Sequence, residues 1–250
     1  MGLLNKLLSK DPGDRAYRTH AHANRLIDSG KTAEAEAEFQ KAYELYVQAE
    51  KNGCSDSRIL TGYAVLLMRM GDFEKAKELV AKVYADKSLS ADDRYQICMD
   101  HALCQWKLGN VDKALSDMEL CGDHHKTGLY YDIMCALLIE KGVETGDFSE
   151  AEKMCGTAMD YDDEDAHTLC NAGWLSHLLG DDAAAVERLK KADSLNANYP
   201  ASKVYLAAIA RENGDAGAAR EYLDAALAVR FPTTSPVTRA FAEELKKQLG

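Results

Sequence analysis

Six glycines, each followed at a fixed distance by an alanine, constrain the fold of this chain more than any other feature. The glycines follow apolar stretches and are separated by 41, 38, 37, 34 and 34 residues: Gly30, Gly71, Gly109, Gly146, Gly180 and Gly214. Five residues after each glycine stands an alanine: Ala35, Ala76, Ala114, Ala151, Ala185 and Ala219. The ninth residue after each glycine is always apolar, and the seventh before it is small in five of the six cases. A period of this length is typical of architectures that repeat one small unit.

These offsets are those expected of paired helices. Glycine tolerates the left-handed backbone that ends one helix, and the small residues beside the turn let two antiparallel helices approach closely. The pattern predicts helices at 14–28, 32–51, 56–70, 73–86, 91–108, 111–121, 127–143, 148–160, 164–178, 182–195, 200–213, 216–230 and 237–249. Because one pair cannot bury its apolar face alone, we expect neighbouring pairs to stack.

Several segments of this pattern resemble the tetratricopeptide-repeat family. GDFEKAKELVAKV at 71–83, GDFSEAEKMCGTAM at 146–159 and GDAGAAREYLDAAL at 214–227 look like second helices of that repeat, and Cys170–Leu195 is similar to a nearly complete one. The resemblance covers about residues 16–230 as six repeats, of which the last two have the family's 34-residue spacing. It implies an all-α fold, a right-handed α-solenoid of about six antiparallel helix-pair repeats with a C-terminal capping helix.

Three parts of the chain follow from this interpretation. Residues 1–13 are an N-terminal segment or start cap, residues 14–230 a superhelical domain, and residues 231–250 a C-terminal capping helix. Apolar residues recur at helical spacing in the last part, where they would cover the exposed face of the final repeat: Val237, Phe241, Leu245 and Leu249.

The resemblance also implies a binding surface, because the inner face of the first helices forms a concave groove for peptides in the family. That face lies thirteen, ten, six and three residues before each turn glycine. The predicted groove residues at these positions are Tyr17, His20, Asn24, Arg58, Met68, Met99, Trp106, Trp174, His177 and Arg211. Thr61, Val65 and Gln96 share the same face. Aromatic, methionine and arginine side chains are enriched at binding hot spots. The alternative is that these residues only pack between repeats or beneath a terminal helix that folds back.

The charge balance restricts the classes of partner. The chain has 30 basic and 41 acidic residues and a net charge of −11, which disfavours nucleic acid. No apolar run approaches the roughly 20 residues that span a bilayer, so we expect no membrane span. A membrane-surface assembly factor with a weak amphipathic anchor stays open as an alternative, on Leu3, Leu4, Leu7 and Leu8.

The cysteines and histidines give no recognisable metal site. Seven cysteines without a CxxC pair predict free thiols in a reducing, cytoplasmic compartment. Cys121, His124 and His125 have donor types suited to zinc, but no second cluster stands at a matching spacing. The acidic run Asp160–Asp165 lacks the glycine and terminal glutamate of a calcium loop, so we interpret it as solvated linker charge. We therefore predict no metal and no cofactor.

The function predicted from these observations is a non-catalytic protein–protein interaction scaffold, an adaptor or co-chaperone. No motif of a hydrolase, metalloprotease or nucleotide-binding enzyme occurs in a suitable context, so no catalytic residue is predicted. The expected partner is a segment of another protein, and self-association into a homo-oligomer stays open. A metal or redox protein built on the cysteines and histidines is the third hypothesis.

Overall fold

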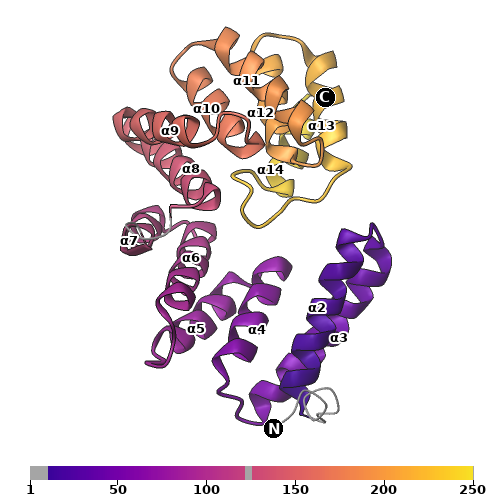
Figure 1. The fold of residues 1–250 in the computed structure, drawn as a ribbon. Coiled ribbons are helices and arrows are strands. Elements are labelled where there is room, and N and C mark those ends of the chain that lie inside the picture. Colours follow the sequence, from indigo (N-terminus) through magenta and orange to yellow (C-terminus); the bar gives the residue numbers. More distant parts are fainter. Residues whose placement is uncertain (1–10, 122–125, 250) are drawn as a thin grey trace. The chain divides into compact units, whose positions relative to one another are not determined.

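The computed structural model describes residues 11–121 and 126–249, and all regular structure in these residues is helical (Figure 1). The helices are α2 (Pro12–Asp28), α3 (Thr32–Lys51), α4 (Ser57–Met70), α5 (Phe73–Tyr84), α6 (Ala91–Lys107), α7 (Val111–Cys121), α8 (Gly128–Thr145), α9 (Ser149–Tyr161), α10 (Ala166–Leu178), α11 (Asp182–Leu195), α12 (Pro200–Glu212), α13 (Ala216–Leu227) and α14 (Arg239–Lys247). The predicted helices are confirmed to within three residues at each end. The predicted leucine anchor and the histidines of the 121–125 cluster lie outside the described residues.

The glycine turns have the backbone that the sequence predicted. All six turn glycines have φ between +73° and +88°, the left-handed region in which a side chain is strained. After three of them an aspartate caps the next helix. The side chains of Asp72, Asp181 and Asp215 accept hydrogen bonds from the backbone N–H groups of Lys75, Ala184 and Ala218. In these three turns the aspartate directly follows the turn glycine and begins the second helix.

The small residues of the repeat lie where helices meet. The six alanines five residues after the glycines are at most 1% exposed. Gly173, which takes the small position before its turn, shows how close the helices come. A Cβ atom there would lie 2.9 Å from Cγ of Leu189 and 3.2 Å from the carbonyl oxygen of Ala185. The apolar residue nine positions after the glycine fills the seam, as at Leu189 and Leu223, which are both fully buried.

The chain divides into two compact units, and the boundary falls inside the third predicted repeat. Unit 1 ends at Gly109 and contains α2 to α6; unit 2 begins at Asn110 and contains α7 to α14. In unit 1, α4 packs on both α2 and α3, and α6 packs on α5. In unit 2, α7 packs on α8, and the pairs α8/α9, α10/α11 and α12/α13 follow one another. The predicted superhelical domain, 14–230, therefore includes parts of both units.

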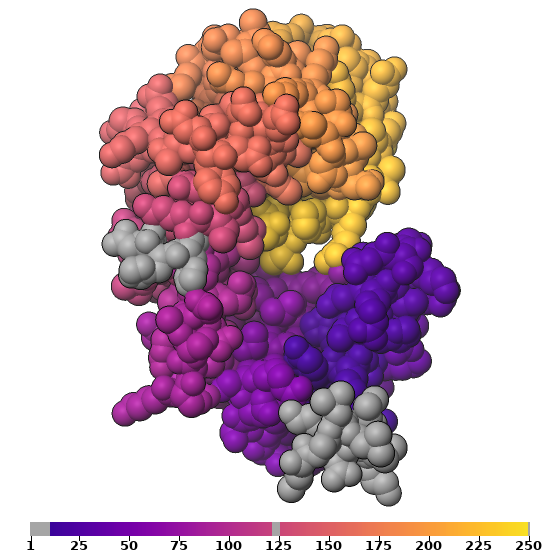
Figure 2. Space-filling model, viewed as in Figure 1, coloured from indigo at the N-terminus to yellow at the C-terminus, as the bar shows by residue number. Residues whose placement is uncertain are grey.

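The residues after α13 fold onto unit 2. Val237, Ala242 and Leu245 are buried in the same hydrophobic core as α12 and α13. Figure 2 shows this terminal part, in yellow, lying against the orange helices of unit 2. The prediction of a capping helix is confirmed, except that Phe241 is 50% exposed and does not belong to the buried face. The cap instead uses the small side chain of Ala242, one residue later.

Candidate functional site

A cavity of about 660 Å³ lies along the first helices of unit 1. Four of the predicted groove residues line it, together with three others from the same predicted face. These residues are Tyr17, His20 and Asn24 of α2, Arg58, Thr61 and Val65 of α4, and Gln96 of α6. The inner positions of three successive first helices are thus brought together around one space, as the spacing from the turn glycines predicted. Their role in binding a partner stays a prediction.

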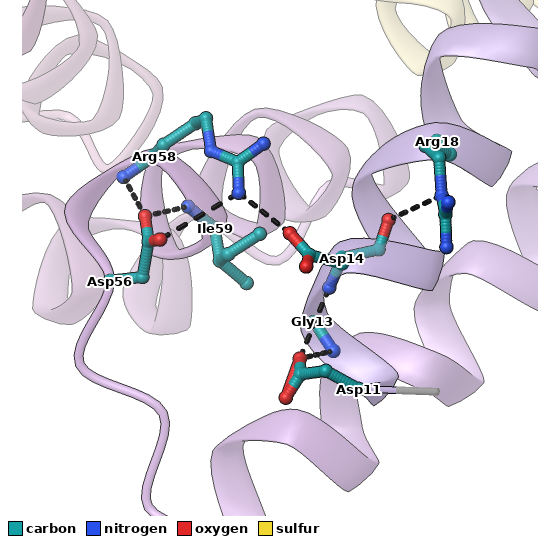
Figure 3. Close-up of polar contacts among 7 residues, drawn as sticks. All are labelled: Asp11, Gly13, Asp14, Arg18, Asp56, Arg58 and Ile59. Atoms are coloured by element: carbon teal, nitrogen blue, oxygen red, sulfur yellow. Dashed lines mark hydrogen bonds and ion pairs between the residues drawn. The ribbon is translucent and has the colours of Figure 1, made fainter. Parts of the chain in front are cut away.

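Arg58 joins the first two helix pairs at this cavity. Its Nη2 atom donates a hydrogen bond to Oδ1 of Asp14 on α2 at 2.7 Å and lies 3.6 Å from Oδ2 of Asp56 (Figure 3). The guanidinium also lies 4.8 Å from the ring centre of Tyr17. The hydrogen bond with Asp14 raises the pKa of Arg58. Because the Arg58 side chain is 44% exposed, these contacts orient it more than they stabilise the fold.

The helix ends beside Arg58 are fixed by two aspartates. Asp11 Oδ2 accepts hydrogen bonds from the backbone N–H groups of Gly13 and Asp14, at 2.7 and 3.2 Å. Asp56 Oδ1 accepts from those of Arg58 and Ile59, at 3.0 and 3.3 Å (Figure 3). Each aspartate occupies the N-cap position of its helix, which satisfies amides that have no partner within the helix. The start of α2 and the start of α4 are therefore both held where Arg58 spans them.

His20 lies at the buried side of the cavity. It is 7% exposed, and its Nδ1 atom is 3.3 Å from the hydroxyl oxygen of Tyr46. Phe39 and Tyr46 both pack edge-on against the imidazole, with ring centres 5.6 and 6.1 Å away. Burial, together with the nearby charge of Arg69, lowers the pKa of His20 to about 4. His20 is therefore neutral at pH 7 and adds a polar but uncharged group to the lining of the cavity.

Three other predicted groove residues are interior residues of the chain. Met68, Met99 and Trp106 are only 5%, 2% and 5% exposed. Their side chains offer no open surface, so the alternative interpretation, packing between neighbouring helices, accounts for their place in the pattern. A role for them in binding a partner has no support in the structure.

The predicted groove residues of unit 2 contact side chains of neighbouring helices and of the segment after α14. Trp174 of α10 stacks on Tyr205 of α12, with ring centres 4.3 Å apart and ring planes 5° apart. His177 Nδ1 is 2.7 Å from Oδ1 of Asp182, and its Nε2 is 3.4 Å from a carboxylate oxygen of Glu212. Arg211 donates a hydrogen bond to Oε1 of Gln248, beyond α14, at 2.6 Å. These residues connect α10, α12 and the terminal segment to one another.

Unit 2 also contains a side-chain cluster that the sequence analysis missed. Single donor atoms of Asp132, Asp165 and His167 lie within 4.8 Å of one another. Asp132 is the fifth residue of α8, Asp165 is the N-cap of α10, and His167 is the second residue of α10. Burial and then the charge of Asp165 raise the pKa of Asp132 to about 8. Asp165 and His167 end an acidic run, but no local spacing relates them to Asp132, which precedes them by more than 30 residues.

Membrane insertion by a helix finds no support in the part of the chain that the structure describes. None of its helices combines the length and the apolar character needed to cross a bilayer.

Comparison with known proteins identifies one repeat and the fold. Residues 166–199 match the family model described as tetratricopeptide repeat. A tetratricopeptide repeat protein from Parabacteroides merdae ATCC 43184 is similar in structure, with a TM-score of 0.66 and 15% identity over 94% of this chain and 99% of that one. PilW, a widely conserved type IV pilus biogenesis factor, gives a TM-score of 0.55 and 16% identity over 94% and 98%.

A third solved structure, the APC/C hetero-tetramer Cut9–Hcn1, gives a TM-score of 0.61 and 15% identity, over 96% of this chain and 46% of the matched chain. Among curated proteins, none matches the chain in sequence. At identities this low, the likeness to the solved structures establishes the fold.

Proposed function

We propose that this chain, in which residues 166–199 match the tetratricopeptide-repeat model, is a scaffold that holds a segment of another protein against the first helices of unit 1. The adaptor or co-chaperone role predicted from the sequence is part of this proposal. The observation that carries it is the cavity of about 660 Å³, which is lined by the inner positions of α2, α4 and α6. Its volume lies within the range of roughly 300–1,000 Å³ in which proteins bind ligands and anchoring side chains.

The surface of this cavity suits a partner segment with both apolar and polar side chains. Tyr17 and Val65 line the cavity and are 37% and 39% exposed, so they offer apolar contact area. Arg58, held beside the Tyr17 ring, adds a guanidinium with bonding capacity at the rim. Asn24 and Gln96 supply amides that can pair with a partner's backbone. Tyrosine and arginine together are the residues most often found at the centre of binding hot spots.

One observation outside the cavity supports a scaffold. Of the similar structures, Cut9–Hcn1 is a hetero-tetramer and PilW is a pilus biogenesis factor, so proteins of this fold take part in assemblies. None of the seven cysteines forms a disulfide, which agrees with the proposed location in a reducing compartment such as the cytoplasm.

A pair of photo-crosslinking experiments tests the proposal. A photoreactive phenylalanine analogue replaces either Tyr17, which lines the cavity, or Tyr84, which is 45% exposed on α5 of the same unit and does not line it. Each protein is irradiated in native extract, and the crosslinked peptides are identified by mass spectrometry. We expect one partner segment to crosslink from position 17 and not from position 84.

A charge substitution then shows whether the cavity itself binds that segment. Val65→Arg places a cation inside the cavity, and Met70→Arg places the same cation on the same helix outside it, at a residue that is 49% exposed. We expect Val65→Arg to weaken binding of the identified segment at least tenfold and Met70→Arg to leave it unchanged. Equal crosslinking from both tyrosines, or equal binding by both arginine variants, would contradict a cavity-bound partner.

A further inference from the structure

We propose that Asp132, Asp165 and His167 bind one divalent first-row transition-metal ion where α8 and α10 begin. All three residues belong to unit 2, so the inference does not depend on the partner proposed for unit 1. One imidazole and two carboxylates form a donor set that suits zinc, cobalt, manganese or iron. Calcium is a poorer fit, because it takes six to eight oxygen ligands.

The distances between the donor atoms fit a shared ion better than they fit direct hydrogen bonds. His167 Nδ1 lies 3.7 Å from Oδ2 of Asp132 and 3.5 Å from Oδ2 of Asp165. Both distances exceed the usual limit of about 3.2 Å for an N–H···O bond. Ligands held at 2.0–2.2 Å around a tetrahedral zinc ion are about 3.3–3.6 Å apart. The two distances from the imidazole nitrogen are thus close to the spacing of ligands on one ion, and all three donor atoms lie within 4.8 Å of one another.

A second histidine in the same unit shows the contrast. His177 Nδ1 is 2.7 Å from Oδ1 of Asp182, the length of an ordinary charge-assisted hydrogen bond. His167 has two carboxylates at similar range and makes such a bond with neither of them. Among the described residues, no lysine or arginine forms an ion pair with Asp132 or Asp165. An ion would supply the positive charge that these two carboxylates lack.

The donors are already oriented by their surroundings. Asp165 uses its Oδ1 atom to cap α10, accepting from the backbone N–H groups of His167 and Thr168 at 2.9 Å each, which leaves Oδ2 toward the cluster. The ring of Tyr199 packs edge-on against His167 at 4.2 Å between centres and fixes the imidazole plane. Asn171 donates a hydrogen bond to the carbonyl oxygen of Asp132 at 3.1 Å, which ties α10 to the start of α8. Supporting contacts of this kind accompany ligands in metal sites.

A small cavity and one unsatisfied polar atom lie at the cluster. A cavity of about 80 Å³ is lined by Asp132, His167 and Tyr199, and by Thr234 and Pro236 of the segment before α14. Oδ1 of Asp132 is buried and has no hydrogen-bond partner among the described residues. The cavity has room for water, so a metal with three protein ligands could take a water molecule as its fourth.

Cobalt titration of the metal-free full chain tests the site, because Co²⁺ reports its ligands in its visible spectrum. We expect one Co²⁺ per chain, with the d–d absorption of nitrogen and oxygen ligands and no thiolate charge-transfer band. Asp132→Asn and His167→Gln should each weaken binding at least about tenfold. His177→Gln is the matched control, because it removes the other aspartate-paired histidine of unit 2, and it should bind Co²⁺ as the wild type does. Circular dichroism confirms that each variant is folded.

Two further variants separate this site from other donors. Asp165→Asn removes a charged ligand and keeps the helix cap, since asparagine caps as well as aspartate, so it should lose affinity without losing helix. The triple substitution Cys121→Ser/His124→Gln/His125→Gln removes the cluster seen in the sequence and should leave binding unchanged. The proposal is overturned if calorimetry shows no stoichiometric binding, if a thiolate band appears, or if Asp132→Asn and His167→Gln bind as the wild type does.

Discussion

Units 1 and 2 are built on the same spacing of glycines and small residues, yet the inner positions of their first helices have different surroundings. In unit 1 these positions surround a cavity of about 660 Å³ lined by partly exposed side chains such as Tyr17 and Val65. In unit 2 Trp174 is stacked on Tyr205 of the next repeat, and Arg211 donates a hydrogen bond to Gln248 of the terminal segment. The repeated spacing therefore determines how the helix pairs stack, but it does not determine whether the inner face of the first helices has an open cavity.

Two features cover part of the inner face of unit 2. Large aromatic residues on neighbouring first helices stack directly on one another, as Trp174 and Tyr205 do. The residues after α13 then return to the unit, where Ser235 and Val237 are buried and Gln248 accepts a hydrogen bond from Arg211. Unit 1 contains no such stack between the first helices that line its cavity, and Gly62 of α4 lies there instead. We infer that an open binding surface in this fold requires small or polar side chains, and no stacked aromatic pair, at the inner positions of the first helices.

The largest effect is expected from a substitution in the core of unit 2, which also tests whether the two units unfold separately. Leu223 is fully buried in unit 2, so Leu223→Ala should lower the free energy of unfolding of that unit by about 3 kcal/mol. Each unit contains one tryptophan, Trp106 in unit 1 and Trp174 in unit 2, and replacing either one by phenylalanine leaves a fluorescence reporter for the other unit. We expect the urea midpoint reported by Trp174 to fall and that reported by Trp106 to stay. An equal fall in both would show that the units unfold as one.

A second expected effect, nearly as large, is the loss of stability of unit 1 in acid. The pKa of His20 falls from 6.5 in the unfolded chain to about 4 in the folded one, so the unfolded chain binds the proton more readily. The stability that this group contributes is complete above pH 6.5 and is lost as the pH falls through 4, up to about 3 kcal/mol. Unfolding followed through Trp106 between pH 7 and pH 4 should show this loss in the wild type and not in His20→Gln.

Asp100 of α6 has the opposite effect on the pH dependence of stability in the same pH range. It is 4% exposed, Oδ2 has no hydrogen-bond partner among the described residues, and burial raises its pKa to about 6. Its neutral form is favoured in the folded chain, so its contribution is present below pH 3.8 and is lost as the pH rises through 6. The difference between the wild type and His20→Gln is therefore the quantity to compare, because Asp100 is common to both. No difference between them would contradict the assignment of the loss to His20.

The smallest effect on the free energy of unfolding is expected for Arg58→Ala, at the rim of the unit 1 cavity. Arg58→Ala removes the hydrogen bond to Asp14 and the contact with Tyr17, but the side chain is 44% exposed. We expect a loss of less than about 1 kcal/mol by chemical denaturation, reduced further in high salt. Binding of the partner segment should fall far more than stability. A loss of several kcal/mol would instead make Arg58 a structural link between α2 and α4.

The fold could be predicted from the sequence because its determinants recur at fixed offsets. Each turn glycine, and each alanine five residues later, repeats one local requirement six times, so the pattern is visible even where single repeats depart from it. Whether a given inner residue lines the groove or is buried between helices was harder to predict. Met99 and Trp106 lie on the same predicted stripe as Gln96, but a helix face turns by about 100° per residue and the buried arc is wide. The pattern therefore placed some residues in the groove that the structure buries.

The cluster in unit 2 could not be predicted, because it depends on how two helices pack. Asp165 and His167 are neighbours in the chain, but Asp132 joins them only because α8 and α10 are adjacent in space. The acidic run before Asp165 suggested calcium, and the absence of a calcium-loop spacing led to its interpretation as solvated charge. A donor set completed by a residue from another repeat leaves no trace in local spacing.

The cysteines of this chain have a consequence for how its motions can be measured. Cys104 is buried in unit 1, and Cys121, Cys135, Cys155 and Cys170 are buried in unit 2. Burial raises the pKa of the Cys104 thiol to about 12, so at neutral pH it reacts only after its surroundings open. The rate at which each buried thiol is labelled by a disulfide reagent then gives the free energy of the opening that exposes it. The wild-type protein therefore carries natural kinetic probes in both units, and their labelling rates would map local opening along the chain without any engineered residue.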